Sequence, residues 1–336
     1  MNSKIRSVIT GVGRALPSCV VTNQEIAESI QRHGGEPSDN AWVVSHTGIM
    51  SRHIADSGEP ASTLGATAAA HALERAGKTP ADVDEIIVAT CTPDYKIPST
   101  ACLIHALLGC RKGIPATDLN AGCTGFIYAL RYADLACRSE GNRVLVIGTE
   151  VLSSITNPGD RDTRPLFGDG AGAVFLEPMP HDAGILGFVV GADGTGHDLL
   201  KVPAGGSALP ATTPGLDPKL LYLRMNGREV YRFATRIIVE VVNHLCQRCT
   251  IAPADINVLI PHQANWRIIE SAARTLDFPL DRIPATIQQF GNTSAASIPI
   301  GLSIAHDQGY LRPGYWVVVC GFGAGLTWGG AIMRWV

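Results

Sequence analysis

Short runs of apolar, β-branched residues recur along the chain and alternate with Ala-rich stretches that have helical spacing. The apolar runs predict buried strands at residues 85–90, 143–148, 171–176, 257–260, 315–319 and 331–335. The intervening stretches predict helices at 62–76, 123–139, 229–249, 263–276 and 294–308. Residues 181–220 hold eight Gly and four Pro, so this segment is predicted to be mostly loops that carry a crossover. The alternation predicts an α/β fold.

The chain also repeats itself. Residues 114–124 (IPATDLNAGCT) align with residues 283–293 (IPATIQQFGNT), and six of the eleven positions are identical. A second pair of similar segments, 80–84 and 253–257, keeps the same order. The sequence therefore predicts a duplicated α/β unit, with an N-terminal half at 1–180 and a C-terminal half at 181–336.

Composition and charge narrow the class of protein. Of the 336 residues, 46% are hydrophobic and 17% charged, which argues against a disordered, coiled-coil or collagen-like chain. The net charge of −3 provides no strong field for nucleic acid or a membrane surface, and an anionic partner would need a local basic patch. Arg14 interrupts the apolar segment 7–16, so neither a signal peptide nor a membrane span is expected and the cytoplasm is the predicted location.

The nine cysteines are scattered and are predicted to be free thiols. Cys246-Gln-Arg-Cys249 is the single CxxC, and no second Cys or His pair lies near it at zinc-binding spacing. No metal site is therefore expected. The simpler interpretation of this motif is two faces of an ordinary helix.

Three side chains that could take part in catalysis are predicted to converge. In the repeat, Cys123 and Asn292 occupy equivalent strand-to-helix turns, which a pseudo-twofold axis would bring together. His262 follows the strand at 257–260, at the carboxyl end where α/β sheets bind ligands. The positive end of the following helix is expected to favour a Cys123 thiolate. Taken singly, the three residues have structural interpretations, but together they fit covalent catalysis.

Four motifs carry a resemblance to a known family. The segments DLNAGCTGF (118–126), PHQAN (261–265), GNTSAASIP (291–299) and GFGAGLTWG (321–329) resemble β-ketoacyl-acyl-carrier-protein synthase III, in matching order and nearly end to end. The resemblance implies a five-layer αβαβα fold of the thiolase type and a homodimer. It also implies decarboxylative condensation of an acyl-CoA primer with malonyl-acyl-carrier protein, the step that initiates fatty acid synthesis. It implies no cofactor, because the thioesters of coenzyme A and of carrier-bound phosphopantetheine are the substrates.

The same resemblance assigns roles to residues. Cys123 would take the acyl group as a thioester, and His262 with Asn292 would contact the malonyl thioester oxygen. Decarboxylation leaves an enolate, so two neutral donors aimed at its oxygen would stabilise charge that develops only then. The backbone N–H groups of Cys123 and Ala324 would form the oxyanion hole for the acyl transfer, although the family usually has Gly where this chain has Ala324.

Substrate contacts are implied in the same way. The resemblance places Trp42, Arg161, Arg228 and Arg267 at the entrance for coenzyme A and carrier protein, where Trp42 and Arg161 would sandwich the adenine. It places Ile97 and Phe322 at the acyl pocket, with Ile97 reaching across the dimer interface. His46 stands where the family often has Arg.

Several alternatives remain open from the sequence. One is a specialised synthase III-like acyltransferase of secondary metabolism that forms a carbon–carbon, ester or amide bond. Another is a non-decarboxylating thiolase, for which Cys320 before the glycine loop is the available second thiol. A thioester hydrolase and a catalytically silent binding subunit are further alternatives. The sequence also leaves the acyl chain open, because one methylene contributes only about 1–3 kcal/mol of discrimination.

Overall fold

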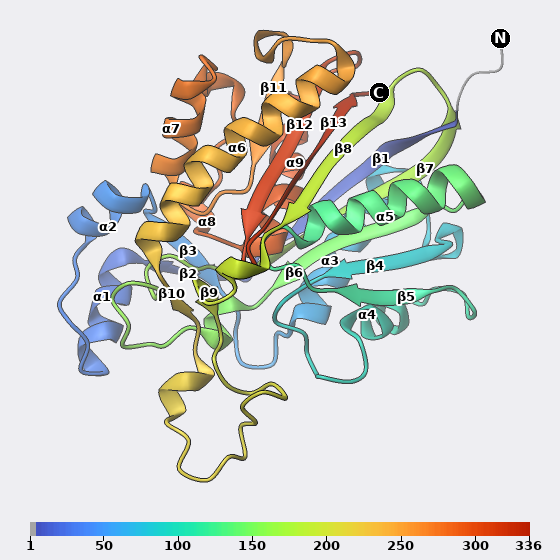
Figure 1. Ribbon diagram of the computed structural model, residues 1–336. Helices are drawn as coiled ribbons and strands as arrows, with labels where there is room; N and C mark the ends of the chain where they lie inside the picture. The colour runs from blue at the N-terminus through green and yellow to red at the C-terminus, as the bar shows by residue number, and fades with distance from the viewer. Residues whose placement is uncertain (1–4) are drawn as a thin grey trace.

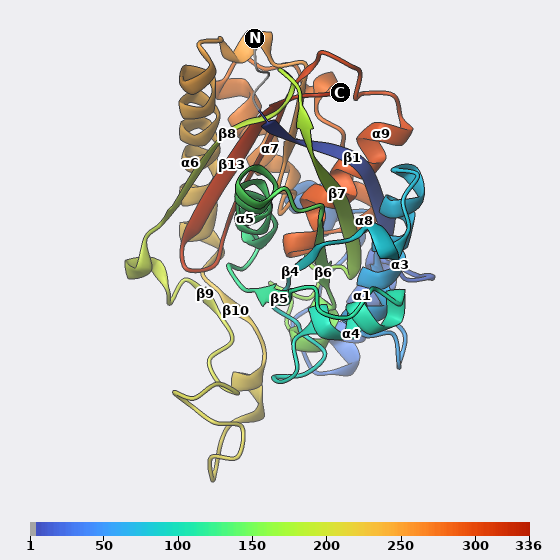
Figure 2. The ribbon, with the colours of Figure 1, turned by 90° about the vertical axis from the view of Figure 1, so that its right-hand side faces the viewer.

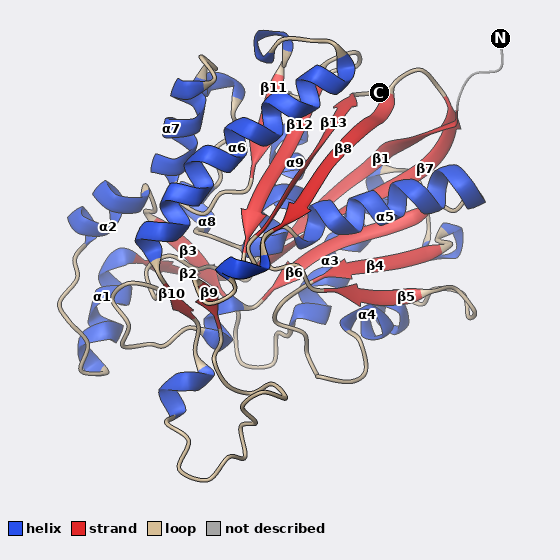
Figure 3. Cartoon of the chain, in the orientation of Figure 1, coloured by secondary structure: helices blue, strands red, loops and turns tan. Residues whose placement is uncertain are grey.

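Two mixed β-sheets form the core of the computed structural model, which describes residues 5–336 (Figures 1 and 3). The first four residues of the predicted N-terminal half lie outside this range. The first sheet has the order β1 (Ile5–Ala15), β7 (Gly170–Pro180), β6 (Val144–Glu150), β4 (Glu85–Ala89) and β5 (Ala116–Leu119). The second has the order β8 (Gly184–Ala192), β13 (Thr327–Arg334), β12 (Trp316–Gly323) and β11 (Val258–Pro261). All six predicted strands are present.

The two sheets repeat one pattern. In the first, β1 and β7 are antiparallel, β7 and β6 are antiparallel, and β6 and β4 are parallel. In the second, β8–β13, β13–β12 and β12–β11 follow the same sequence of directions. The predicted duplication is thus confirmed in the topology of the sheets. We propose that the halves divide in the turn between β7 and β8.

Helices complete five layers. The helices α3 (Ala61–Arg75) and α4 (Thr100–Leu108) cover the outer face of the first sheet, and α6 (Gly227–Cys249) and α7 (Trp266–Thr275) cover that of the second. The helices α5 (Gly125–Glu140) and α9 (Ser297–Asp307) lie between the sheets, and Figure 2 shows α5 end-on in this position. Because both central helices are buried by sheets on two sides, their apolar residues fuse the halves into one core. The predicted αβαβα layering is confirmed.

One strand of the second half was not predicted. Residues 184–192 form the edge strand β8, although the segment was expected to be mostly loops. Its glycines weaken the strand signal in the sequence, yet packing requires at least one of them, because a Cβ on Gly191 would lie 2.5 Å from the indole of Trp328. The following segment, up to about residue 223, is mostly irregular and projects from the body in both views (Figures 1 and 2).

The remaining elements are short or lie at the periphery. They are β2 (Cys19–Thr22), α1 (Asn23–Arg32), α2 (Asn40–Thr47), β3 (Ser51–Ile54), β9 (Leu200–Lys201), β10 (Arg224–Met225) and α8 (Ile287–Phe290). The helix α1 begins with a capping box, in which Thr22 and Glu25 satisfy each other's backbone N–H groups. The strands β2 and β3 pair with each other, with α1 and α2 between them in the chain; β3 packs against α8, and α2 packs against α7.

Candidate active site

Cys123, His262 and Asn292 line one cavity of about 130 Å³. Cys123 lies in a strand-to-helix turn as predicted, between β5 and α5. Asn292 lies in the corresponding turn of the second half, but the short helix α8 precedes it, so the predicted strand before this turn is wrong. His262 directly follows β11. The structure therefore brings together, at the meeting point of the two halves, the three residues that the sequence singled out.

Burial dominates the electrostatics of Cys123. The residue is 8% exposed. Burial raises the pKa of the Cys123 thiol to about 11, the Glu150 carboxylate adds to the increase, and the Ser294 hydroxyl opposes it. The resting residue is therefore a neutral thiol. The prediction that the helix end favours a Cys123 thiolate is wrong for the resting protein, because the cost of desolvating the charge outweighs the field of one helix terminus.

Glu150 and Cys91 complete this environment, and the sequence analysis missed both. Glu150, at the end of β6, is fully buried and accepts hydrogen bonds from Thr92 Oγ1 at 2.7 Å, the Cys91 backbone N–H at 3.1 Å and Cys91 Sγ at 3.3 Å. Cys91 Sγ lies 4.0 Å from the Ser294 hydroxyl. A carboxylate at the end of an otherwise apolar strand was the available signal in the sequence.

His262 is a neutral imidazole with one free nitrogen. It is 1% exposed, and burial lowers the pKa of its ring to about 3. Its Nδ1 lies 2.6 Å from the Ser297 hydroxyl, whereas its buried Nε2 has no partner within residues 5–336. The Phe322 ring packs edge-on at 5.3 Å. An unpaired buried nitrogen beside a cavity is available for a ligand.

The carboxamide of Asn292 is held in one orientation. Its Oδ1 accepts a hydrogen bond from the Ser294 N–H at 2.8 Å, and its own backbone N–H donates to Leu166 O at 2.8 Å. Ser294 adopts a left-handed φ of 48°, an uncommon conformation for serine that often marks functional sites. With Oδ1 occupied, the Nδ2 hydrogens of Asn292 remain for the cavity.

Close backbone packing brings two N–H groups together beside Cys123. A Cβ on Gly323 would lie 2.7 Å from the Cys123 nitrogen, and one on Gly122 would lie 3.2 Å from the Ala324 nitrogen. Ala324 is not among the residues with a positive φ, so its backbone does not require the glycine that is usual in the family. This geometry fits the oxyanion hole that the resemblance implies.

A second cavity, of about 720 Å³, also reaches Cys123. Its apolar lining includes Leu119, Leu152, Ile155, Phe167, Val202 and Leu223. Phe322 lines the smaller cavity with His262, not this one. Ile97 is 87% exposed and lines neither cavity of its own chain.

The four predicted entrance residues lie on elements around the smaller cavity. On α2, Trp42 is half-buried, with the Arg161 guanidinium 4.6 Å from its ring centroid and the His46 ring stacked on it at 4.6 Å. Arg228 and Arg267 are exposed in the first turns of α6 and α7, next to cavity-lining residues.

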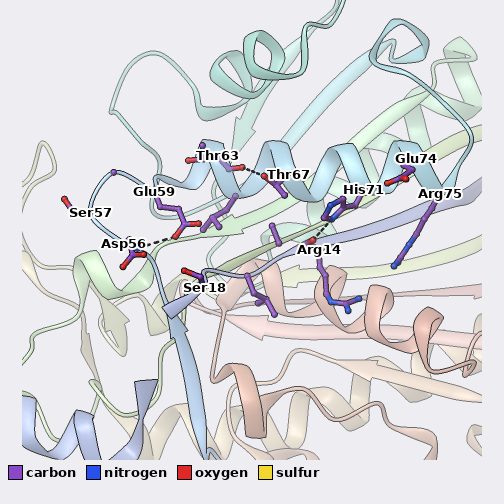
Figure 4. A pocket seen from close by; sticks show the side chains of 14 residues that line it. Arg14, Ser18, Asp56, Ser57, Glu59, Thr63, Thr67, His71, Glu74 and Arg75 are labelled. Carbon is purple, nitrogen blue, oxygen red and sulfur yellow. Dashed lines mark hydrogen bonds between the residues drawn. The ribbon is translucent and has the colours of Figure 1, made fainter. Parts of the chain in front are cut away.

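A larger polar groove lies elsewhere, between α3 and the end of β1 (Figure 4). Its volume is about 820 Å³, and Arg14, His71 and Arg75 are among its lining residues. The imidazole ring of His71 is hydrogen-bonded to the carbonyl oxygen of Arg14. The groove contains none of the candidate catalytic or substrate-binding residues, so the cavity at Cys123 is the candidate active site.

Within residues 5–336, no group of three or more His, Cys, Asp or Glu side chains is arranged to hold a metal ion. In the same range, no helix has the length and apolar character needed to cross a membrane. All nine cysteines are free.

Two duplicated α/β halves with a thiol, an imidazole and a carboxamide at their junction define a thiolase-like condensing enzyme. Comparison with known proteins agrees. Residues 117–194 match the family 3-oxoacyl-[acyl-carrier-protein] synthase III, and residues 246–335 match the C-terminal family of the same name. The chain belongs to the β-ketoacyl-acyl-carrier-protein synthase III family. It is an acyltransferase of the type that initiates fatty acid synthesis.

Individual relatives support this assignment over the full length. The chain is 43% identical over 330 residues to β-ketoacyl-[acyl-carrier-protein] synthase III of Roseiflexus sp. (strain RS-1), covering 98% of each chain. The crystal structure of synthase III from Thermus thermophilus superposes with a TM-score of 0.89 at 38% identity, covering 98% of this chain and 99% of that one. The priming β-ketosynthase of the R1128 polyketide pathway has a TM-score of 0.89 at 33% identity, covering 100% and 98%.

Proposed function

We propose that Cys123 carries the acyl group during a two-stage condensation. In the first stage its sulfur attacks the thioester carbonyl of an acyl-CoA. A new carbon–sulfur bond forms, the bond to the coenzyme sulfur breaks, and the thiol proton ends on the released coenzyme A. The N–H groups of Cys123 and Ala324 would stabilise the oxyanion that forms between these events.

In the second stage His262 and Asn292 would bind the thioester oxygen of malonyl-carrier protein. Loss of CO2 leaves its bonding electron pair on the enolate, and the enolate carbon attacks the acyl-Cys123 carbonyl. The carbon–sulfur bond then breaks and restores the thiol after protonation. The observation that carries this proposal is the cavity that Cys123 shares with an unpaired, neutral His262 Nε2 and the oriented Asn292 amide.

The entrance would bind the nucleotide and the carrier through local positive charge. Trp42 and Arg161 would supply stacking and cation–π contacts to an adenine, but the guanidinium lies 4.6 Å from the Trp42 ring centroid and must move aside before a base fits between them. Arg228 and Arg267 provide the local basic groups that an anionic carrier protein needs in a chain of net charge −3. All nine cysteines are free thiols, and we propose the cytoplasm, where thiols stay reduced, as the location.

We also propose that the enzyme is a homodimer joined along β5. This strand ends the first sheet, and no other strand within residues 5–336 pairs with its outer edge. Large apolar side chains are exposed on the elements around it, namely Tyr95, Ile97, Leu107, Tyr132 and Leu135. An apolar surface around an open strand edge favours pairing with a second copy about a twofold axis. Ile97 would then reach the acyl cavity of the partner.

A second candidate function is priming in secondary metabolism. His46, at an entrance position that often carries Arg in the family, supports it, whereas the similarity to the R1128 priming ketosynthase at 33% identity fits either candidate. The two candidates share one chemistry and differ in the primer and the carrier. Comparing the turnover of several acyl-CoAs with the fatty-acid carrier and with a polyketide carrier separates them.

The test of the shared chemistry uses intact-mass measurement. The protein is incubated with a panel of acyl-CoAs, and malonyl-carrier protein is then added. We expect an acyl adduct that Cys123→Ala lacks, followed by release of CO2 and a β-ketoacyl product on the carrier. Free acid, an ester or an amide would instead identify a hydrolase or another acyltransferase. Condensation without malonyl dependence would identify a thiolase, and no adduct would indicate a binding subunit.

A further inference from the structure

His262 has one fixed contact and one free nitrogen, and the identity of the fixed contact decides what the free nitrogen can do. The Nδ1 atom lies 2.6 Å from Ser297 Oγ, and both residues are at most 2% exposed. Ser297 is the first residue of α9, the central helix that follows Asn292. Its hydroxyl has no other hydrogen-bond partner within residues 5–336.

A neutral imidazole carries its hydrogen on either Nδ1 or Nε2. If Nδ1–H donated to Ser297, the serine hydroxyl hydrogen would be buried without an acceptor, and Nε2 would be a lone pair without a donor. If Ser297 donates to Nδ1 instead, the hydroxyl hydrogen and Nδ1 satisfy each other, and Nε2–H beside the cavity is the single open group. An unsatisfied buried polar group destabilises the arrangement that contains it, and the first arrangement leaves two such groups whereas the second leaves one. The second arrangement is therefore preferred.

We propose that Ser297 is a positioning residue, which donates its hydroxyl hydrogen to Nδ1 and so holds His262 as the Nε2–H tautomer. The free nitrogen is then a hydrogen-bond donor and not a base. A donor is what an enolate oxygen needs, whereas a lone pair at Nε2 would repel it. Because burial holds the pKa of His262 at about 3, the ring stays neutral over the working range and the tautomer decides its role.

This inference rests on the proposed function for its catalytic meaning, but the tautomer itself can be measured without turnover. The full-length enzyme is prepared with 15N-labelled histidine, and long-range 15N–1H correlation spectra identify which ring nitrogen carries hydrogen. His262 is assigned by the signal that disappears in His262→Gln. We expect Nε2–H between pH 6 and 8, and Nδ1–H in the wild-type enzyme would overturn the inference.

Variants connect the tautomer to the reaction. In Ser297→Ala we expect a mixture of tautomers and a fall of roughly 10-fold in malonyl decarboxylation, with acylation of Cys123 retained. Ser297→Thr keeps the hydroxyl and is expected to restore both the Nε2–H signal and the rate. An unchanged tautomer and rate in Ser297→Ala would refute the proposed role.

A matched control lies on the same helix. Ser303 is also fully buried, and its hydroxyl accepts hydrogen bonds from Arg14 and Arg75 instead of contacting the imidazole. Ser303→Ala is expected to leave the His262 tautomer unchanged even where it lowers stability. If His262→Ala, which has no donor, keeps full decarboxylation while the wild-type tautomer is Nε2–H, the proposed function fails and the assignment of the tautomer stands.

Discussion

The surroundings of Cys123 oppose the charge that its reaction requires. Burial and the Glu150 carboxylate both raise the pKa of the thiol, and only the Ser294 hydroxyl among the neighbouring side chains lowers it. A neutral thiol in an apolar cavity resists oxidation and alkylation until a substrate arrives, because the thiolate is the reactive form. The surroundings of Cys123 therefore keep its thiol unreactive until a thioester substrate is bound.

The contribution of Glu150 can be measured directly. Glu150→Gln removes a negative charge while keeping an oxygen that accepts from Thr92 and Cys91, so the pKa of Cys123 is expected to fall below about 11. At a given alkaline pH the variant then holds more thiolate. The rate at which iodoacetamide alkylates Cys123, followed as a function of pH, measures this shift in the pKa of its thiol. The exposed Glu140→Gln is the control, and an unchanged or higher midpoint in Glu150→Gln would contradict the argument.

Asn292 tests the need for a neutral donor. Asn292→Asp can still accept the Ser294 N–H, but it presents a carboxylate oxygen to the enolate in place of an N–H donor. We expect malonyl decarboxylation to fall on the order of 100- to 1000-fold, measured as CO2 release. Asn257→Asp, whose side-chain oxygen likewise accepts a backbone N–H, is expected to leave the rate near that of wild type. Equal losses of CO2 release in Asn292→Asp and Asn257→Asp would contradict the role of Asn292 as a neutral donor to the enolate.

At the scale of elements, the glycine-rich end of β12 packs against the Cys123 backbone and shapes the proposed oxyanion hole. Gly323 lies against the Cys123 backbone, and a methyl group there would meet the Cys123 nitrogen at 2.7 Å. Backbone on both sides of the contact has little freedom to move, so the added methyl must displace the N–H groups. The strand end and the turn before α5 are therefore one structural unit.

Gly323→Ala is expected to slow acylation of Cys123 strongly and to lower the free energy of unfolding by about 1–3 kcal/mol, as overpacking does. Intact-mass kinetics and urea denaturation measure the two effects. Gly206→Ala is the control, because nothing lies within 4 Å of a Cβ at that position. Acylation at the wild-type rate in Gly323→Ala would show that this contact does not shape the site.

The elements also show why sequence reasoning succeeded and failed where it did. Buried central strands such as β4 and β6 are apolar on both faces and were predictable from composition alone. The repeat placed Cys123 opposite Asn292 because the turns that hold them are duplicated. The strand β8 was missed because its glycines are required by tertiary contacts, such as that of Gly191 with Trp328, which the sequence does not show. Glu150, Cys91 and Ser297 were missed because the residues they contact are distant in the sequence.

For the whole molecule, the open edge of β5 predicts a two-chain assembly. Leu107→Glu places a charge in the exposed apolar surface on α4, beside this edge, and is expected to shift the enzyme toward a monomer. Sedimentation equilibrium measures the mass. Leu280→Glu changes a similarly exposed leucine in the second half and is expected to leave the dimer intact. A wild-type monomer, or a Leu107→Glu dimer of unchanged stability, would refute this interface.

The proposed function assigns the acyl-carrying thiol to the first half of the chain and the enolate-stabilising donors to the second half. The most direct measurement compares the two half-reactions in variants of each half. His262→Ala is expected to form the Cys123 acyl adduct from acyl-CoA yet to lose CO2 release from malonyl-carrier protein. Cys123→Ala is expected to form no adduct and to retain CO2 release. Loss of both half-reactions in both variants, or the reverse pattern, would contradict the account.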